Sequence, residues 1–517
     1  MKQKTWIISA LMYAMVIMAC LGVLHLLKEM TENNAPSGTV AEESTDHTEP
    51  EIDFAEEEET KEDIAETGAE EEESDVPVER EEGYYGWKQE LPQIFPSVPE
   101  EVPYEPPRLI LATDLHYQSA QADDGGAAFQ LFVERGDGKV VEYLPELLEA
   151  FMDQVIEEHP SALVLSGDIT MNGEKINHEE LARGLMRVQD AGIPVLIVPG
   201  NHDINNPHAA VYFGEEKAET DPVTPEEFYN IYHMYGYDQA ISRDDASLSY
   251  VYQLDERNRL LMLDTCQYEP KNMVEGQLKV ETLRWADEQL KKAKEDGMNV
   301  LPIGHHNLLA QSRMYTTQCA MNNNGDVIEL FQKYELPLYL SGHLHVQRIR
   351  KHKAEPGAAD DSYGIMEIVT DALSIPPCQY ALLEWKRDGS MEYSTKAVDV
   401  SAWAARTGSQ NPDLLDFEGW SELYIQKLII DQIRGVVKNL GNDVEHSMAE
   451  VYASVYIDYY AGRRIDAKGI RSSKGYRWWE RNMPDSYLLK ELDAMIDDSD
   501  RDNNYMLLPE VNAAAEE

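Results

Sequence analysis

The chain has 517 residues and a formal net charge of −52, which predicts more than one folded unit and an acidic surface. With this excess of acidic residues, we expect no continuous basic surface that could bind a phosphate backbone. The net charge therefore argues against a nucleic-acid polymer as a partner. It does not exclude a small anionic ligand, because a bound cation would dominate the local field.

Residues 1–30 form an apolar N-terminal segment. The stretch from Thr5 to Leu27 is almost wholly apolar and follows Lys2 and Lys4. A helix of this length crosses a hydrocarbon core of roughly 30 Å, and the basic start places its N-terminus in the cytoplasm. We expect an uncleaved signal anchor, which makes the chain a single-pass cell-membrane protein with the rest of the chain outside the cytoplasm. A lipoprotein, with a weak cleavage box at Ile17–Cys20, and a secreted protein are the alternatives.

Residues 31–100 are a low-complexity segment with 24 acidic and 3 basic residues. Such a segment cannot bury enough apolar surface to fold, and its charges repel one another. We expect an acidic, disordered linker.

Five apolar segments in the region 101–400 each end in a sharp turn followed by metal-binding side chains. Val195–Val198 is rich in β-branched residues and leads through Pro199 and Gly200 into a polar triplet. These five segments are followed, in order, by Asp114 and His116, by Asp168, by Asn201, His202 and Asp203, by His305, and by His343 and His345. Most intervals leave room for a helix and a crossover, so strand ends that lie in one core would meet at one rim.

Mixed Asp, His and Asn ligands without a thiolate suit Mn, Fe or Zn rather than calcium or a structural zinc site. Seven candidate ligands exceed what one ion needs, whereas two ions roughly 3.5–4 Å apart can share a bridging carboxylate. Such a pair lowers the pKa of a bridging water and clamps the attacking and leaving oxygens of a phosphoryl group. The residue types therefore favour hydrolysis of a phosphate ester by metal-bridging hydroxide, without a covalent enzyme intermediate.

The five motifs, in this order, resemble those of the calcineurin-like metallophosphoesterase superfamily over about residues 107 to 400. The implied fold is α/β, a four-layer αββα metallophosphoesterase sandwich. The resemblance also implies that His202 stabilises the attacked phosphate or protonates the leaving oxygen, and that Asp203 orients it. The ligands that it implies are Asp114, His116 and His345 for the first metal, Asp168 as the bridge, and Asn201, His305 and His343 for the second.

The sequence around three of these motifs resembles the cyclic-nucleotide phosphodiesterase branch of the superfamily, and more narrowly its bacterial cell-surface members with a helical C-terminal domain. The stretches that carry this resemblance are Asp168 to His178, Asn201 to Pro207 and His305 to Leu309. Asn172 and His178 also follow a metal-bearing strand end. They are candidate contacts for a base or a ribose, although capping of the following helix is an alternative for both.

Two further regions frame the predicted site. The Gly- and Asp-rich loop between Tyr117 and Tyr143 should overhang it, either as an exposed hairpin or as a substrate lid. Beyond residue 400 the pattern becomes helical and rich in large aromatics, which predicts an all-α domain over residues 401–517, docked on the catalytic domain. We expect the tail from Asp498 onward to fray.

These observations predict a metallophosphoesterase that hydrolyses small phosphodiesters with two divalent metal ions, and by resemblance cyclic nucleotides are the leading substrates. A phosphomonoesterase or a nucleotide pyrophosphatase of the same superfamily is the enzymatic alternative. A non-catalytic cell-surface binding protein is the alternative from a different class, and the complete ligand set argues against it. The sequence indicates neither the native metals nor the oligomeric state.

Overall fold

The computed structural model describes residues 104–313, 318–352 and 364–508. The predicted signal anchor (residues 1–30) and acidic linker (residues 31–100) lie outside these described residues, so both stay predictions. None of the helices that the structure describes combines the length and the hydropathy needed to traverse a bilayer.

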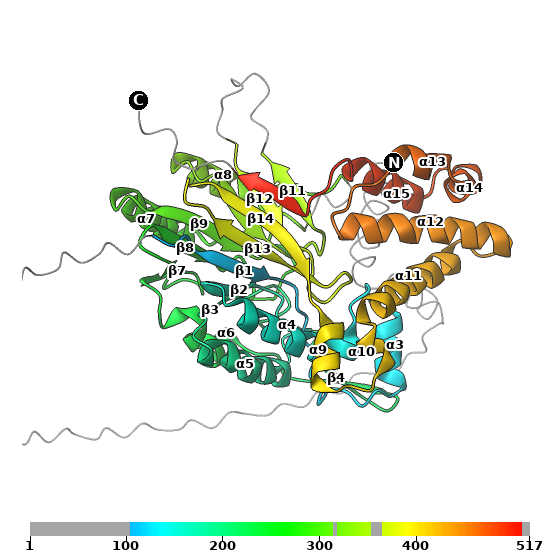
Figure 1. The fold of residues 1–517 in the computed structure, drawn as a ribbon, viewed down its shortest axis with the longest axis horizontal. Coiled ribbons are helices and arrows are strands. Elements are labelled where there is room, and N and C mark those ends of the chain that lie inside the picture. Colours follow the sequence, from blue (N-terminus) through cyan, green and yellow to red (C-terminus); the bar gives the residue numbers. More distant parts are fainter. Residues whose placement is uncertain (1–103, 314–317, 353–363, 509–517) are drawn as a thin grey trace, which may run out of the picture. The chain divides into compact units, whose positions relative to one another are not determined.

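Two mixed β-sheets form the centre of the sandwich (Figure 1). The first has the strand order β15-β14-β13-β1-β2-β3, and the second has the order β11-β12-β10-β9-β8-β7-β6. The first sheet consists of β1 (Arg108–Ala112), β2 (Ala162–Ser166), β3 (Val195–Val198), β13 (Gln379–Trp385), β14 (Met391–Ala397) and β15 (Tyr505–Leu508). The second consists of β6 (Ser242–Arg243), β7 (Tyr250–Gln253), β8 (Asn258–Leu263), β9 (Asn299–Gly304), β10 (Leu338–Ser341), β11 (Arg348–Lys351) and β12 (Met366–Val369).

The strands that carry the predicted site are parallel within each sheet. In the first sheet β1 pairs with β2 (Leu111 opposite Val164) and β2 with β3 (Val164 opposite Leu196). In the second, β9 pairs with both β8 and β10. Parallel strands end at the same edge of a sheet, so each sheet presents its metal-type residues along one edge.

Helices cover the outer face of each sheet, which confirms the predicted αββα sandwich. The amphipathic helices α4 (Leu144–Glu158), α5 (Lys175–Asp190) and α6 (Pro225–Tyr232) pack beside the first sheet, and α7 (Val280–Glu295) and α8 (Asn324–Lys333) beside the second. Helix α6 begins where predicted: the Thr224 hydroxyl accepts from the Glu227 amide, and the Glu227 carboxylate accepts from the Thr224 amide.

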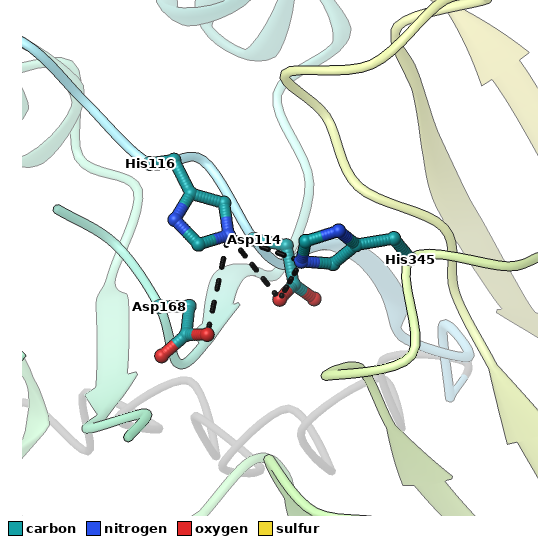
Figure 2. Close-up of side chains that lie close together, drawn as sticks. All are labelled: Asp114, His116, Asp168 and His345. Carbon is teal, nitrogen blue, oxygen red and sulfur yellow. Dashed lines mark hydrogen bonds and ion pairs between the residues drawn. The ribbon is translucent and has the colours of Figure 1, made fainter. Parts of the chain in front are cut away.

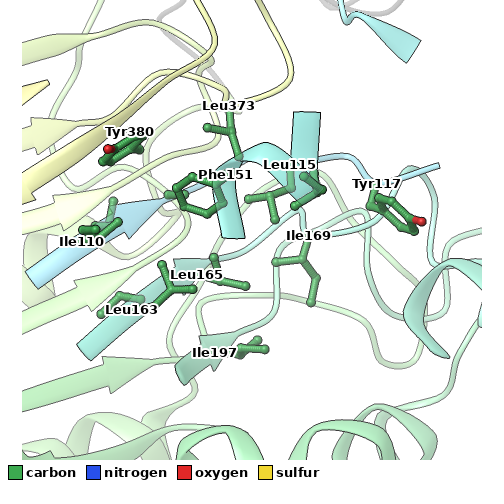
Figure 3. Close-up of a cluster of buried hydrophobic side chains, with 14 of the residues drawn as sticks. Ile110, Leu115, Tyr117, Phe151, Leu163, Leu165, Ile169, Ile197, Leu373 and Tyr380 are labelled. Carbon is green, nitrogen blue, oxygen red and sulfur yellow. The ribbon is translucent and has the colours of Figure 1, made fainter. Parts of the chain in front are cut away.

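One hydrophobic core joins the inner faces of the two sheets. Figure 3 shows its part around the first sheet, with Ile110, Leu163 and Ile197 on three adjacent strands. Ile303 and Leu340 of the second sheet belong to the same cluster. Each such fully buried side chain contributes about 1.5–3 kcal/mol, so this core fixes the two sheets and their loop-bearing edges against each other.

The C-terminal region is helical, as predicted, and it docks on the sandwich. Its helices are α9 (Val400–Thr407), α10 (Pro412–Leu415), α11 (Phe417–Val436), α12 (Asn442–Tyr460), α13 (Ala467–Ser472), α14 (Lys474–Asn482) and α15 (Tyr487–Asp498). Leu344, Val346 and Ile375 of the sandwich share a hydrophobic cluster with Ile425 and Tyr456 of these helices.

Two local predictions were wrong. Residues 505–508, expected to fray, form β15 and pair antiparallel with β14, with Tyr393 opposite Met506. The loop between Tyr117 and Tyr143 is not an exposed hairpin, because it contains helix α3 (Ala127–Glu134), which packs on the ribbon formed by β4 (Ala210–Phe213) and β5 (Glu216–Glu219). The alternative, a substrate lid, stays a prediction. In both places the chain gains partners that are distant in sequence.

Candidate metal centre

The loops that follow β1, β2, β3, β9 and β10 bring the predicted ligands together at the shared edge of the sandwich. One group contains Asp114, His116, Asp168 and His345 (Figure 2), and a second contains Asp168, His305 and His343. Within each group, one candidate ligand atom from every residue lies within 4.8 Å of the others. Asp168 belongs to both groups, which is the arrangement that a bridging carboxylate requires.

Close contacts join the imidazole nitrogens of the cluster to carboxylate oxygens and to one another. His345 Nε2 lies 3.2 Å from Asp114 Oδ1 and 3.1 Å from His116 Nε2. His305 Nε2 lies 3.2 Å from Asp168 Oδ2, the oxygen that is also 4.0 Å from His116 Nε2. The same carboxylate oxygen of Asp168 therefore faces both groups.

Five of the predicted ligands adopt a backbone conformation that residues other than glycine rarely take. The φ angles are 53° at Asp114, 45° at His116, 47° at Asp168, 70° at His343 and 58° at His345. Each such conformation costs on the order of 1–3 kcal/mol and persists only where the surroundings impose it. Here neighbouring loops bond to one another: the His116 amide donates to the Asp168 carbonyl at 2.9 Å.

Contacts with backbone carbonyls determine which ring nitrogen of His305 and of His343 remains available to a metal ion. His305 Nδ1 donates to the Ser166 carbonyl at 2.9 Å, and His343 Nε2 donates to the Gln318 carbonyl at 2.9 Å. A carbonyl can only accept, so each of these nitrogens carries the proton. The other nitrogen of each ring, Nε2 of His305 and Nδ1 of His343, is therefore the one that can bind a metal ion.

Four buried atoms in the cluster have no hydrogen-bond partner: Asp114 Oδ1, His116 Nδ1, Asn201 Oδ1 and His305 Nε2. Leaving a buried polar atom unsatisfied costs about 1–3 kcal/mol, so each one needs an explanation. The four atoms are a carboxylate oxygen, an amide oxygen and two imidazole nitrogens, and all of them are metal-ligand types. The residues present therefore fit a pair of divalent ions that share Asp168.

Electrostatics keep the carboxylates ionised. Burial opposes the charge of Asp168, but His305 and His202 hold its pKa well below the usual range. Burial likewise opposes a second proton on His305 and on His345. Even so, Asp168 and Asp114 raise the pKa of His305 to about 9, and Asp114 raises the pKa of His345 to about 9. Metal binding here must release protons from these imidazoles, so the positive charge of the metal ions replaces the positive charge of the imidazolium groups.

His202 lies beside the cluster and is less buried than four of the ligands. Its Nδ1 contacts the Met171 carbonyl at 2.8 Å and Asn172 Oδ1 at 3.1 Å, while its Nε2 lies 4.0 Å from Asp168 Oδ2. The ring is 18% exposed, against 2% or less for Asp114, His116, Asp168 and His305. Nε2 is thus the nitrogen left for a substrate.

The prediction that the Asp203 side chain orients the His202 ring is wrong. The contacts of its carboxylate are the amides of Ile169, Thr170 and Gly200 and the Thr170 hydroxyl, at 2.8–3.2 Å. Asp203 therefore ties the loops after β2 and β3 together, whereas Asn172 and Met171 hold the His202 ring. Burial and the neighbouring Asp168 raise the pKa of Asp203 to about 7.

The two predicted substrate contacts have different positions. Asn172 lies against His202, so its oxygen contacts the His202 ring directly. His178 is fully buried in α5, where Nδ1 contacts the Tyr232 hydroxyl at 3.0 Å and Nε2 contacts the Asp203 carbonyl at 2.9 Å. His178 is therefore neither a substrate contact nor a helix cap, because both nitrogens are used inside the fold.

Two residues near the cluster had not been singled out. Asp137 Oδ2 lies 3.5 Å from His345 Nδ1 and 2.5 Å from Lys139 Nζ, and Asp137 and Lys139 are both buried. Burial would favour the neutral acid, but Lys139 and His345 hold the pKa of Asp137 far below its usual range. The sequence signal was the Gly136-Asp-Gly138 tripeptide in the loop after the first metal motif.

Comparisons with known proteins agree with this geometry. Residues 107–347 match the family model described as calcineurin-like phosphoesterase, and residues 399–502 match the C-terminal domain of cyclic nucleotide phosphodiesterase. A search of curated proteins found no match.

Among solved structures, a dimetal phosphatase from Danio rerio is 16% identical with a TM-score of 0.43, and the match covers 57% of this chain and 97% of that chain. The purple acid phosphatase PPD1 from yellow lupin (Lupinus luteus) is 14% identical with a TM-score of 0.38, covering 57% of this chain and 52% of that chain. The family models confirm the resemblance seen in the motifs: the chain contains a calcineurin-like phosphoesterase domain followed by a C-terminal domain of the cyclic nucleotide phosphodiesterase type.

Proposed function

We propose that this protein hydrolyses small phosphodiesters and that seven residues hold two divalent metal ions for the reaction. The proposed ligands are Asp114, His116 and His345 for one ion, Asn201, His305 and His343 for the other, and Asp168 for both. The observation that carries the proposal is the shared position of Asp168 between two groups of ligands. The ligand types suit Mn, Fe or Zn.

When bound, the two ions lower the pKa of a water molecule and offset the negative charge of the phosphoryl group. Hydrogen bonds from neighbouring residues orient the carboxylates of Asp114 and Asp168. Asp114 Oδ2 accepts from the His343 amide at 2.9 Å and from the Thr113 hydroxyl at 2.8 Å, so Oδ1 is left to face the cluster. Asp168 Oδ1 accepts from the His202 amide at 2.7 Å, which leaves Oδ2 between the two groups.

His202 supplies the proton transfer in this proposal. Its Nδ1–H is held by the Met171 carbonyl and Asn172 Oδ1, which fixes the orientation of the ring. Nε2–H then contacts a phosphoryl oxygen or donates its proton to the departing alcohol oxygen. General acid catalysis of this kind contributes roughly 10²–10⁴-fold.

A diester substrate, with cyclic nucleotides as the leading class, is supported by the match of residues 399–502 to the C-terminal domain of cyclic nucleotide phosphodiesterase. The motif sequences around Asp168, Asn201 and His305 support the same substrate class. Monoesterases and pyrophosphatases use the same kind of metal core, so the pocket around it decides the substrate.

The experiment compares turnover of bis-p-nitrophenyl phosphate and p-nitrophenyl phosphate by the full-length protein reconstituted with Mn²⁺, with Asp168→Ala as the inactive control. We expect preference for the diester, followed by turnover of a cyclic nucleotide in a panel. Preference for the monoester would replace the diesterase assignment with a phosphatase. A protein that binds Mn²⁺ and leaves every phosphoester intact would favour a binding protein.

We further propose that residues 1–30 anchor the protein in the cell membrane with residues 101–517 outside the cytoplasm. The support is the sequence of that segment alone. Fractionation with N-terminal sequencing tests it, because a soluble product that has lost its first residues would overturn the anchor.

A further inference from the structure

A short loop of the phosphoesterase domain, residues 136–139, lies between the metal cluster and the C-terminal helices. Three of its backbone carbonyls accept a hydrogen bond from a helical side chain. The pairs are Gln432 Nε2 to the Gly136 carbonyl at 3.1 Å, Tyr456 Oη to the Asp137 carbonyl at 3.5 Å, and Tyr424 Oη to the Lys139 carbonyl at 3.0 Å. The C-terminal helices therefore satisfy the backbone of this loop.

Apolar packing holds the same loop against α11. Gly138 has a φ of +106°, and a Cβ added to it would lie 2.1 Å from Ile425 Cδ1. Ile425 is 1% exposed and belongs to the cluster that also contains Leu344 and Val346, the residues that alternate with His343 and His345. The helices thus pack against both the loop and the ligand-bearing strand end.

The side chains of this loop reach the first group of ligands. Asp137 Oδ2 faces His345 Nδ1 at 3.5 Å, and Nε2 on the opposite side of that ring lies 3.2 Å from Asp114 Oδ1. A carboxylate can only accept, so it favours the form of His345 with a proton on Nδ1, in which Nε2 is the nitrogen that binds a ligand. Lys139 Nζ contacts the same carboxylate oxygen at 2.5 Å and prevents Asp137 from being a buried unpaired charge.

We propose that Asp137 is a positioning residue for the first metal ion, and that α11 and α12 hold the loop that places it. In this role the C-terminal domain completes the surroundings of the metal centre from outside the sandwich. Asp137 acts through His345, by fixing the tautomer and the orientation of the ring. The proposal rests on the proposed metal centre, and it deepens that function by giving the C-terminal helices a part in it.

The test is titration of the metal-free, full-length protein with Mn²⁺ by calorimetry, followed by electron paramagnetic resonance of the loaded protein. Removing a partner that orients a metal-bound histidine typically weakens metal affinity by about 10–100-fold. We expect Asp137→Asn to weaken one of two binding events by that factor and to leave the other within about threefold. The spectrum should then change from a coupled Mn pair to a single Mn ion at substoichiometric loading.

The contribution of the helices is tested by the double variant Tyr424→Phe/Gln432→Ala, which removes two bonds to the loop and leaves the ligands untouched. The matched control is Tyr476→Phe/Gln426→Ala: the Tyr476 hydroxyl bonds Asp493 within the helical region, and Gln426 is exposed on α11. We expect the first double variant to weaken the same binding event as Asp137→Asn, and the control to bind Mn²⁺ like the wild type. Thermal unfolding in chelator verifies that each variant is folded.

The outcomes separate the two proposals. Two Mn²⁺ ions bound by the wild type and unchanged affinity in folded Asp137→Asn would overturn the role of Asp137 alone. An effect of Asp137→Asn without an effect of Tyr424→Phe/Gln432→Ala would overturn the role given to the helices. A wild type that binds no Mn²⁺ would overturn the metal centre and this inference with it.

Discussion

Asn201 shows how a single buried atom can indicate a ligand. Its Oδ1 is buried without a hydrogen-bond partner, although its backbone carbonyl accepts from Asn272 Nδ2 at 2.8 Å. A neutral amide oxygen is a modest ligand that adds no negative charge, which suits a cluster that already contains Asp114 and Asp168.

We expect Asn201→Ala to reduce the number of Mn²⁺ ions bound from two to one, because the second group loses an oxygen and leaves only His305, His343 and the shared Asp168. Metal affinity at that position should fall by at least about 100-fold, the upper end of the loss seen when an indirect partner is removed. Calorimetric stoichiometry measures this. Asn201→Asp is the matched control and should still bind two ions; two tightly bound ions in Asn201→Ala would exclude Asn201 as a ligand.

His202 differs from the ligands because its expected role is chemical. We expect His202→Ala to lower kcat by roughly 10²–10⁴-fold while the protein still binds two Mn²⁺ ions. The loss should be larger for a diester with an alkyl leaving group than for one with p-nitrophenol, since p-nitrophenolate departs readily without a proton. Asn172→Ala should show the same leaving-group trend at smaller size, because the Met171 carbonyl still holds the ring. Equal losses on both diesters would contradict the role as general acid.

At this residue scale the sequence predicted the identity of the cluster better than its contacts. Asp114, Asp168 and His305 follow recognisable strand ends, so their convergence could be expected. The partners of Asp203 and the burial of His178 depend on how the loops after β2 and β3 fold over each other, and no local pattern encodes that.

At the scale of elements, the cluster depends on how closely the turns after the strands approach. A Cβ added to Gly200 would lie 2.1 Å from the Asp168 amide nitrogen and 2.2 Å from Asp168 Oδ1. The turn after β3 therefore requires glycine in order to reach the turn after β2.

We expect Gly200→Ala to destabilise the fold by about 1–3 kcal/mol and to abolish binding of at least one Mn²⁺ ion, because the added methyl group must displace Asp168. Urea unfolding in chelator and calorimetry measure the two effects. Gly325→Ala is the control: it lies in α8 with no atom within 4 Å of an added Cβ, so it should be neutral or slightly stabilising. A Gly200→Ala protein with unchanged stability and two bound ions would show that the turn can relax.

Helices and strands with a strong periodic pattern in the local sequence could be predicted. Those that depend on contacts with distant parts of the chain could not. Strand β14 and helix α4 follow clear periodic patterns between turn signals. Strand β15 forms only because the chain returns from the helices to pair with β14 at the edge of the first sheet. Helix α3 is short and surrounded by Gly and Asp, and its packing on the β4–β5 ribbon stabilises what the local sequence does not favour.

At the scale of the whole molecule, a buried ion cluster joins the last helix to the sandwich. Asp498, at the end of α15, is 5% exposed. Its Oδ1 lies 2.9 Å from an Arg350 nitrogen and 3.1 Å from Arg313 Nε, and its carbonyl accepts from Arg348 at 2.8 Å. These contacts connect β11 and the loop after β9 to the C-terminal helices.

We expect Asp498→Asn to destabilise the protein by about 3–5 kcal/mol, because it leaves the buried guanidinium of Arg348 and its neighbour Arg350 without their carboxylate. Urea unfolding followed by tryptophan fluorescence measures this, and Trp403 and Trp420, which pack against the core of the sandwich, report on separation of the helical region. The wild type should unfold in one transition, and Asp498→Asn should show an earlier transition for the helices. Asp431→Asn, which removes an exposed i,i+4 partner of Lys427 on α11, is the control and should change stability by less than about 0.5 kcal/mol.

Equal, small effects of both variants would mean that apolar packing around Ile425 and Leu344 holds the helices without help from the ion cluster. In that case the loop at residues 136–139 would remain in place in Asp498→Asn, and the affinity for both Mn²⁺ ions would match that of the wild type.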